Sequence, residues 1–287
     1  EPSGTPTFTF SKFDDVLYYE KDLVNVGKVG RRWFGEQFNI TNEQTFDFTI
    51  PNLDNITPVS IYVNTASKSF GNSSFACKVN NQDFGTINFP ALVAFSGVEG
   101  YESAINNTIS LSSNTISLKL TYNNGGVPSS NGYLDFIKIS SKRNLVGYGK
   151  QFSFFNNDEL SNVGIGQYTI TSATNIPQVW DVTDLSNVIK YENTSGATFA
   201  FKVNLGNQKK YVALDLSDTY TPLKEGNSVV QNQNLKGTIF NNNQGNFQDI
   251  DYLIITPQIL ITQAERLADF HRNNSGLSVR VVTLEKI

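Results

Sequence analysis

The chain has 287 residues, a formal net charge of -4, and 39% hydrophobic and 12% aromatic residues, which is enough to fill the cores of two folded domains. Its acidic balance and the lack of any large Lys/Arg cluster argue against a nucleic-acid partner, and no apolar run approaches the roughly 20 residues of a membrane-spanning helix. A single Cys and a single His exclude an internal disulfide and a Cys/His zinc site, and the Asn-, Ser- and Thr-rich composition favours an extracytoplasmic bacterial β protein.

Residues 7–143 carry apolar side chains with the period of two that is typical of half-buried strands. The clearest series are Phe46, Phe48 and Ile50; Val59, Ile61 and Val63; Phe75, Cys77 and Val79; and Ile116, Leu118 and Leu120. Residues 134–139 are apolar on both faces, which indicates a strand near the centre of a sheet, and residues 123–126 (NNGG) predict a turn. We therefore predict one antiparallel β-sandwich over residues 1–143.

A second antiparallel β domain, also sandwich-like, is predicted over residues 144–233. Its apolar alternating positions are Phe152, Phe154, Tyr168, Ile170, Phe199, Phe201 and Val203. The polar segment 205–210 is typical of a hairpin loop that leads into a strand over residues 211–216. The polar stretch 222–234 is the expected linker to the last part of the chain.

Residues 234–287 predict a strand–helix–strand unit. Residues 252–255 are apolar without alternation, as in a parallel strand covered on both faces. Thr256 is expected to cap a helix that begins at Pro257, and Gly276 is expected to end it. The predicted buried face of this helix consists of Leu260, Ala264, Leu267 and Ala268. One such unit cannot bury both faces of its sheet, so we expect it to be the start of a larger, truncated α/β domain.

Several segments resemble one protein family. Residues 251–257 (DYLIITP), 263–272 (QAERLADFHR) and 276–285 (GLSVRVVTLE) are similar to the opening of the gingipain-type cysteine peptidase domain. Upstream, residues 30–38 (GRRWFGEQF), 46–51 (FDFTIP), 135–145 (DFIKISSKRNL) and 177–184 (PQVWDVTD) resemble the N-terminal region of the type IX secretion sortases of Bacteroidota, the PorU family. These segments touch most of the chain and follow the order expected of that family.

The resemblance implies a full-length parent that is a cell-surface cysteine endopeptidase or transpeptidase of gingipain- or caspase-like α/β fold. Such sortases remove the C-terminal signal domains of type IX cargo and attach the cargo to surface lipopolysaccharide. They work at the extracellular face of the outer membrane with the barrel protein PorV and other attachment-complex proteins. The nucleophilic Cys and its His partner lie downstream of the first strand–helix–strand unit in this family, so the resemblance places no catalytic residue in this chain.

Three kinds of side chain could be proposed for catalysis, and each has a simpler explanation. Cys77 alternates with apolar neighbours, which predicts a core thiol with a raised pKa. His271 lies near the predicted end of the helix, where the helix dipole favours an imidazole. Glu99 and Glu102 are too isolated in the sequence to be interpreted as an acid/base pair.

Two further motifs are candidates for binding. Trp33 and Glu36, with a glycine between them, could form a sugar-stacking or protein-contact surface, although core packing is the more common role of a large aromatic residue. Asp181 and Asp184 could hold a hard cation such as Ca²⁺, but an Asp-capped turn explains the same spacing. We therefore expect no cofactor or metal, with Ca²⁺ at these two residues as the one weak candidate.

The sequence leads to two hypotheses from different classes. The first is a non-catalytic scaffold and docking region of a type IX secretion sortase. The alternative is a carbohydrate-binding β-sandwich module. Saturable glycan binding that is lost on Trp33→Ala would favour the second hypothesis.

Overall fold

The fold was analysed in a computed structural model, which describes residues 1–27, 32–224, 226, 239–242 and 244–286. The chain divides into two compact units, Glu1–Tyr220 and Thr221–Ile287, and each is described by itself. The protein is mainly β, with several antiparallel sheets and a small α/β element, as the sequence predicts.

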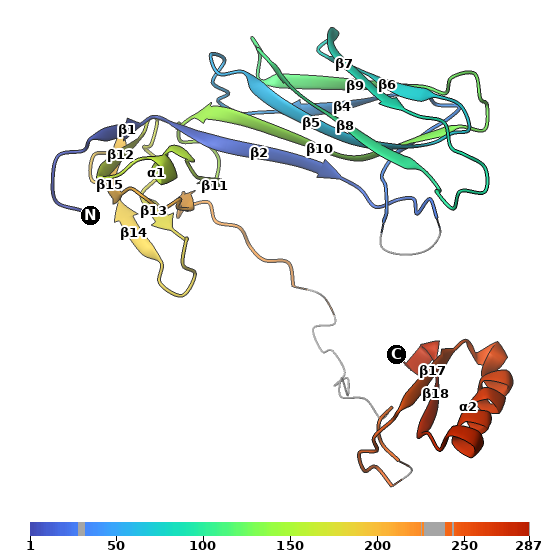
Figure 1. Cartoon of the computed structure of the whole chain (residues 1–287). Coiled ribbons are helices and arrows are strands. Elements are labelled where there is room, and N and C mark those ends of the chain that lie inside the picture. The colour runs from blue at the N-terminus through green and yellow to red at the C-terminus, as the bar shows by residue number, and fades with distance from the viewer. Residues whose placement is uncertain (28–31, 225, 227–238, 243, 287) are drawn as a thin grey trace. The chain divides into compact units, whose positions relative to one another are not determined.

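The first unit contains a β-sandwich of two antiparallel sheets (Figure 1). One sheet has the order β2 (Lys12–Glu20), β10 (Asn131–Asn144), β5 (Val59–Lys68) and β8 (Tyr101–Ile109), with β3 (Gln37–Phe38) also paired to β10. The other has the order β4 (Glu43–Thr49), β9 (Thr115–Asn123), β6 (Ser73–Val79) and β7 (Gln82–Phe89). The predicted alternating residues meet between the two sheets, where nearly all of them are buried.

Strand β10 is the longest strand of the sandwich and lies between β2 and β5, as its two apolar faces predict. Its register against β5 shifts between Leu134 and Phe136, so Asp135 is an extra residue in a β-bulge. The C-terminal end of β10 and the N-terminal end of β2 extend to the second half of the unit.

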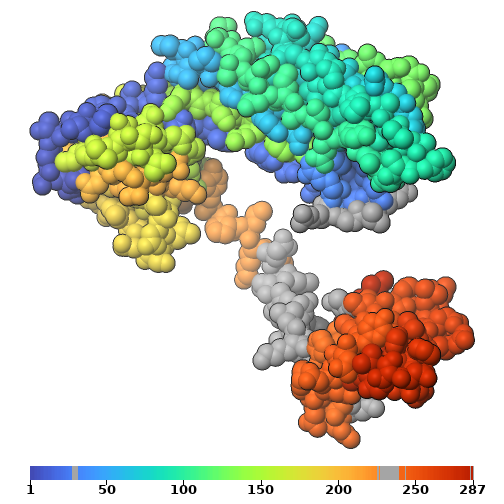
Figure 2. Space-filling view, in the orientation of Figure 1, coloured from blue at the N-terminus to red at the C-terminus, as the bar shows by residue number. Residues whose placement is uncertain are grey.

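That second half, which we call the second lobe, has its own hydrophobic core. One sheet has the order β1 (Phe8–Phe10), β12 (Ile165–Ile170) and β15 (Phe199–Asn204). The other has the order β11 (Gln151–Phe154), β16 (Tyr211–Leu214), β13 (Gln178–Asp181) and β14 (Ile189–Glu192), and a short helix α1 (Asp158–Ser161) lies beside them. In Figure 2 the two lobes of this unit lie against each other without a break.

The structure differs from the sequence prediction at the start of the chain. Strand β1 pairs in parallel with β12, and Phe10 and Phe13 are buried in the core of the second lobe. Residues 1–143 therefore do not all belong to the first sandwich. The short alternating pattern at the N-terminus identifies a strand but carries no information about its partner.

The predicted hairpin around residues 205–210 is wrong. Strand β15 pairs with β12, whereas β16 pairs with β11 and β13 in the other sheet. The loop thus crosses from one layer to the other, because both flanking strands are apolar toward the same core and each finds an earlier strand as its partner.

A buried carboxyl group in the second lobe leads to a prediction on pH. Glu159 of α1 is fully buried and accepts hydrogen bonds from Tyr211 Oη at 2.7 Å and from the Lys209 backbone N–H at 2.9 Å. Burial raises the pKa of Glu159 above its ordinary 4.5, although these hydrogen bonds oppose the shift. The protonated form is therefore favoured by folding, so its stabilising contribution is present at low pH and is lost as the pH rises through the folded pKa.

We expect the free energy of unfolding of the protein, relative to Glu159→Gln, to fall as the pH is raised from about 4 to about 8. In a Trp33→Phe background, urea unfolding monitored by Trp180 fluorescence measures this difference, because Trp180 is then the one remaining tryptophan and lies on β13. The variant is the control, since its amide does not titrate. A difference that stays constant over this pH range would contradict the prediction.

The second unit contains two parallel strands, β17 (Tyr252–Thr256) and β18 (Val279–Thr283), joined through the 3₁₀ turn η1 (Gln258–Leu260) and helix α2 (Ile261–Ser275). A further 3₁₀ turn, η2 (Leu284–Lys286), follows β18. The predicted strand–helix–strand order and the left-handed stop at Gly276, with φ 66°, are confirmed. The predicted boundary between residues 233 and 234 lies outside the described residues. None of the helices in the described part of the chain is both long and apolar enough to span a membrane.

Two details of this unit correct the prediction. Pro257 is extended, with ψ 150°, and precedes η1, so α2 begins four residues later than expected. Ala264 and Ala268 of α2 are buried, but Leu260 of η1 and Leu267 of α2 are exposed. The two alanines allow the helix to approach the small sheet closely, and a sheet of two strands does not reach the outer leucines.

Candidate binding surfaces

The outward face of the five-stranded sheet carries an ordered row of side chains. Alternate residues of β5 point into the core, so Tyr62 faces outward. The register places Lys138 of β10 directly between Tyr18 of β2 and Tyr62, and places Asn106 of β8 on the other side of Tyr62. Four adjacent strands thus present two phenols, an ammonium group and an amide in one line.

Aromatic rings stack across the same face. The ring centroids of Tyr18 and Phe136 are 5.1 Å apart with planes at 25°, and those of Phe136 and Tyr62 are 5.5 Å apart at 16°. Tyr18 is 54% exposed, so this stack lies at the surface of the sheet. Exposed aromatic rings that gather on one surface form a candidate binding site.

At one end of this face, the β-bulge builds a polar network. Asp135 is buried, and its carboxylate accepts hydrogen bonds from Arg32 and Asn64, each at 2.8 Å. Arg32 also forms two hydrogen bonds with Glu102. Burial raises the pKa of Asp135, and the Arg32 guanidinium opposes this rise. A cavity of about 290 Å³ lies beside Arg32, with Phe34 and other apolar side chains in its lining.

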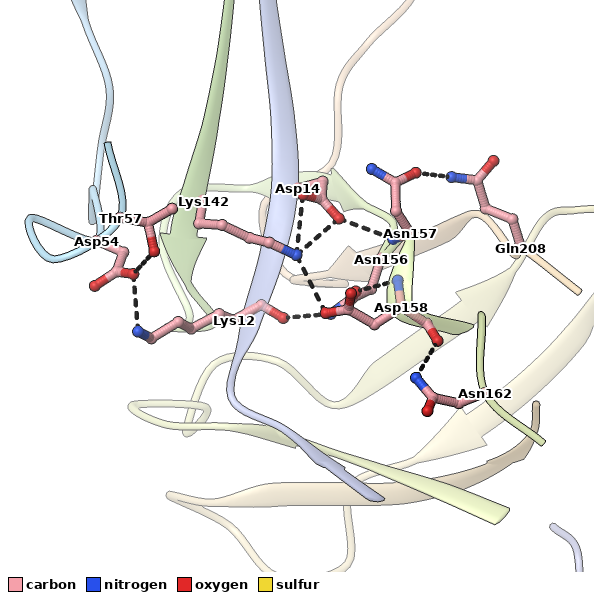
Figure 3. Close-up of polar contacts among 10 residues, drawn as sticks. All are labelled: Lys12, Asp14, Asp54, Thr57, Lys142, Asn156, Asn157, Asp158, Asn162 and Gln208. Atoms are coloured by element: carbon pink, nitrogen blue, oxygen red, sulfur yellow. Dashed lines mark hydrogen bonds and ion pairs between the residues drawn. The ribbon is translucent and has the colours of Figure 1, made fainter. Parts of the chain in front are cut away.

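At the other end, polar contacts join the sandwich to the second lobe (Figure 3). Lys142 of β10 lies 3.0 Å from Asp14 and 3.4 Å from Asp158, while Lys12 lies 2.8 Å from Asp54. The backbone N–H of Asn157 donates to Asp14 at 2.8 Å. The contacts of Lys142 with Asp158 and of Asp14 with Asn157 join β10 and β2 to the segment that leads into α1, whereas the Lys12–Asp54 pair lies within the sandwich.

A recess of about 430 Å³ lies at this joint and is called the inter-lobe recess. Its lining includes Val16, Pro58, Lys138, Ser140, Phe155 and Asn157, with Asp14, Asp15, Thr57, Ser141 and Lys142 completing it. Lys138 therefore belongs both to the inter-lobe recess and to the aromatic row. The volume is within the range of small-molecule sites, which often lie between domains.

A second surface lies at the opposite end of the sandwich, where Lys68 pairs with Asn131 at the start of β10. Here the loops 69–72 and 90–100 are joined by a hydrogen bond from the Leu92 backbone N–H to the Ser69 carbonyl. Their side chains Phe70, Val93 and Phe95 are 61%, 67% and fully exposed. We call these two loops the apolar loop pair.

Phe95 in the apolar loop pair adopts a φ of 62°. This left-handed backbone conformation is rare for a bulky residue and costs free energy, in the order of 1 kcal/mol or more. The protein thus holds an aromatic side chain in solvent at a cost to its own stability, which makes these loops a candidate contact surface.

The predicted contact residues Trp33 and Glu36 lie close in sequence but have different environments. Trp33 is 45% exposed. Glu36 is largely buried and accepts hydrogen bonds from Tyr19 and Lys21; burial tends to raise the pKa of Glu36, but these two hydrogen bonds lower it overall. Glu36 therefore holds the segment after residue 31 onto the sheet.

The two aspartates considered for Ca²⁺ cap turns. Asp181 accepts hydrogen bonds from the backbone and side chain of Thr183, and Asp184 accepts one from the Ser186 backbone N–H. Within the described ranges, no group of three or more His, Cys, Asp or Glu side chains is placed to hold a metal ion.

The side chains considered for catalysis each have an environment of their own. Cys77 is fully buried in the sandwich, as predicted, and burial raises the pKa of its thiol to about 12. His271 lies on α2 in the other unit, with its ring near that of Tyr252. Glu99 pairs with Lys68, and Glu102 pairs with Arg32, which also binds Asp135.

The sequence interpretation missed Tyr18, Phe136 and Lys138. The alternation of buried residues in β5 places Tyr62 on the solvent-facing side of the strand, so the exposure of Tyr62 could have been predicted from the sequence. The cross-strand register that unites these residues depends on strands more than 40 positions apart in the sequence, and alternation within one strand does not reveal it.

Comparison with known proteins identifies the relatives of this chain. Residues 245–287 match peptidase family C25. The chain is similar to dimeric latent PorU from Porphyromonas gingivalis, with a TM-score of 0.66 and 20% identity, over 99% of this chain and 26% of that one. The resemblance to the gingipain-type family and to PorU is thereby confirmed at the level of the fold, and the chain spans about a quarter of the PorU length.

Carbohydrate-binding modules show only a weak similarity. A CBM36 in complex with calcium and xylotriose matches with a TM-score of 0.30 and 16% identity, over 44% of this chain and 98% of the module. The CBM35 from Cellvibrio japonicus Abf62 matches with a TM-score of 0.31 and 10% identity, over 45% and 97%. These scores are too low to support any argument on function. No curated protein matches the sequence.

Proposed function

We propose that this chain, with the fold of part of PorU and a C25 match in residues 245–287, is a docking region of a PorU-like type IX secretion sortase. It works at the extracellular face of the outer membrane and brings its peptidase to PorV, to other attachment-complex proteins and to the signal domains of cargo. The apolar loop pair is the observation that carries this proposal.

Three features of the apolar loop pair favour a protein partner. Phe70, Val93 and Phe95 present apolar groups on two loops that are joined by a hydrogen bond, so they are held as one surface. Aromatic anchors of this kind dominate the affinity of protein interfaces. The adjacent Lys68 and Glu99 neutralise each other, so the surface adds no attraction for anionic lipid headgroups.

The peptidase chemistry is assigned to the longer parent protein. The C25 match covers only residues 245–287, and Cys77 is a core residue whose raised pKa keeps it protonated at neutral pH. A thiolate nucleophile needs a neighbouring base and an oxyanion site, which its apolar surroundings do not supply.

The docking proposal predicts that Phe70→Ser combined with Phe95→Ser weakens binding to purified PorV by at least about tenfold. Isothermal titration of the chain with PorV in detergent measures the affinity. Ile56→Ser combined with Leu185→Ser is the matched control, because these two residues are also exposed and apolar but lie outside the apolar loop pair. The assignment would be refuted if the Phe70→Ser/Phe95→Ser variant bound PorV with unchanged affinity. It would also be refuted if the chain without substitutions did not bind PorV.

The carbohydrate-binding alternative has a separate observation in its favour. The stacked rings of Tyr18, Phe136 and Tyr62 lie on the open sheet face, away from the apolar loop pair. Trp33, which first suggested this function, is not part of that stack.

A further inference from the structure

We propose that residues 16–20 of β2 bind an extended peptide of another protein as an additional antiparallel strand. We call these residues the free edge. The peptide has apolar side chains at alternate positions and a basic residue opposite Glu20. The free edge shares no residue with the apolar loop pair, so this proposal does not depend on the proposed docking function. Each proposal can therefore fail without the other.

The backbone of β2 has one unpaired side. This strand is the last of its sheet and pairs with β10 on its other side (Figure 1). The Asp14 N–H points away from β10 and donates to the Phe155 carbonyl at 2.9 Å. Because alternate residues of an antiparallel strand direct their backbone groups to the same side, those of Tyr18 and Glu20 also point to the free edge. In the part of the chain that the structure describes, no strand pairs with β2 there, and such unpaired groups suit another extended backbone.

The side chains along the free edge suit an apolar strand. Leu17 and Tyr19 of β2 and Phe48 of β4 are only partly buried and lie at the margin of the sandwich core. The rings of Tyr19 and Phe48 meet across the two sheets, with centroids 6.3 Å apart. At the opposite margin the sheets are tied together, because Asn107 of β8 donates to the Phe84 carbonyl of β7 at 2.9 Å. A strand added to β2 would therefore cover apolar side chains that water now reaches.

A recess of about 280 Å³ lies at the Val16 end of the free edge. Phe154, Phe155 and Val182 of the second lobe are in its lining, so it can receive one apolar side chain at the end of the peptide. The Val16 N–H already donates to the Asp15 carboxylate at 3.0 Å, so we expect the peptide to pair from the Val16 carbonyl onward. In strand addition, the backbone hydrogen bonds supply affinity and such a recess supplies specificity.

The charges at the free edge favour a basic residue at one end of the peptide. Glu20 and Asp22 form no ion pair within the described ranges, whereas Asp14 and Asp15 at the other end are paired with cations of β10. A basic side chain opposite Glu20 is therefore complementary. A second copy of this chain fits less well, because symmetric pairing of two β2 strands about Tyr18 would place the apolar Val16 opposite Glu20.

The test uses the whole chain and the fluorescein-labelled peptide Lys-Val-Thr-Ile-Thr-Leu, with fluorescence polarisation as the readout. In the antiparallel orientation its Lys lies opposite Glu20, its two Thr N–H groups point to β2, and its Val and Ile N–H groups point away. N-methylation of both Thr residues is the test modification, and N-methylation of Val and Ile is the matched control. In the chain, Tyr18→Pro removes one N–H of the free edge, which an edge strand tolerates, and Tyr18→Ala is the control that keeps this N–H.

We expect the unmodified peptide to bind, and both N-methylation of Thr and Tyr18→Pro to lower the affinity by about tenfold, because each removes backbone hydrogen bonds. N-methylation of Val and Ile, and Tyr18→Ala, should change the affinity by less than about threefold. Equal binding of the two N-methylated peptides, equal binding by the two Tyr18 variants, or no peptide binding at millimolar concentration would overturn the proposal. A dimer of the chain in light scattering that Tyr18→Pro dissociates would overturn it in favour of a second copy at the free edge.

Discussion

Phe13→Ala is expected to lower the free energy of unfolding of the second lobe by about 3–5 kcal/mol, although residue 13 belongs to the first strand of the sandwich. Phe13 is fully buried, and its ring centroid lies 6.0 Å from that of Phe154 and 6.3 Å from that of Phe152. Both partners are on β11 of the second lobe. The loss is a large part of the 5–15 kcal/mol that stabilises a typical domain.

Trp180 makes this expectation specific to the second lobe. The chain has two tryptophans, so in a Trp33→Phe background the fluorescence of Trp180 on β13 reports that lobe alone. Urea unfolding of the background protein with and without Phe13→Ala gives the difference in free energy. Phe70→Ala is the control, because Phe70 is exposed and should change the stability by less than about 0.5 kcal/mol. A Trp180 transition that Phe13→Ala does not move would show that the N-terminal strands do not support the second lobe.

Arg143→Met is expected to cost about 3–5 kcal/mol of stability, because it breaks a buried ion pair on one side only. The Arg143 guanidinium lies 2.8 Å from Asp15, donates to the Pro51 carbonyl at 2.6 Å, and packs on the rings of Phe13 and Tyr148. Methionine keeps much of the volume but leaves the partly buried Asp15 carboxylate without its cation.

A double-mutant cycle separates the charge from the packing. Adding Asp15→Asn to Arg143→Met should recover part of the loss, since the uncompensated carboxylate is then removed. Lys190→Met is the control, because the Lys190–Glu192 pair is exposed and such pairs contribute at most about 1 kcal/mol. Thermal unfolding measures all four variants. A cost of Arg143→Met no larger than that of Lys190→Met would mean that the pair does not stabilise the joint.

The alternation of apolar residues was sufficient to locate most strands. Val59, Ile61 and Val63 are all fully buried, as their period predicts. It was not sufficient to pair them, because any strand with one apolar face can join any sheet that covers the same core. Alternation alone therefore predicts a hairpin at residues 205–210, although the strands on either side lie in different sheets.

The same limit explains what the sequence revealed of the candidate sites. The buried state of Cys77 follows from its own strand and could be predicted. The position of Lys138 between Tyr18 and Tyr62 could not be predicted, because the three residues lie on different strands and only the strand register brings them together. Phe95 gave no signal, because its exposure and its positive φ depend on how the loop 90–100 packs on loop 69–72.

Strand β10 sets the separation between the two ends of the first unit. It begins beside Lys68 near the apolar loop pair and ends at Asn144, where Leu145 enters the core of the second lobe. Its 14 residues span roughly 46 Å at about 3.3 Å each, and it is hydrogen-bonded to a strand on both sides along much of this length. A pulling force between these ends would load its interstrand hydrogen bonds in shear. A molecule held at one end is therefore kept at a nearly constant distance from anything held at the other.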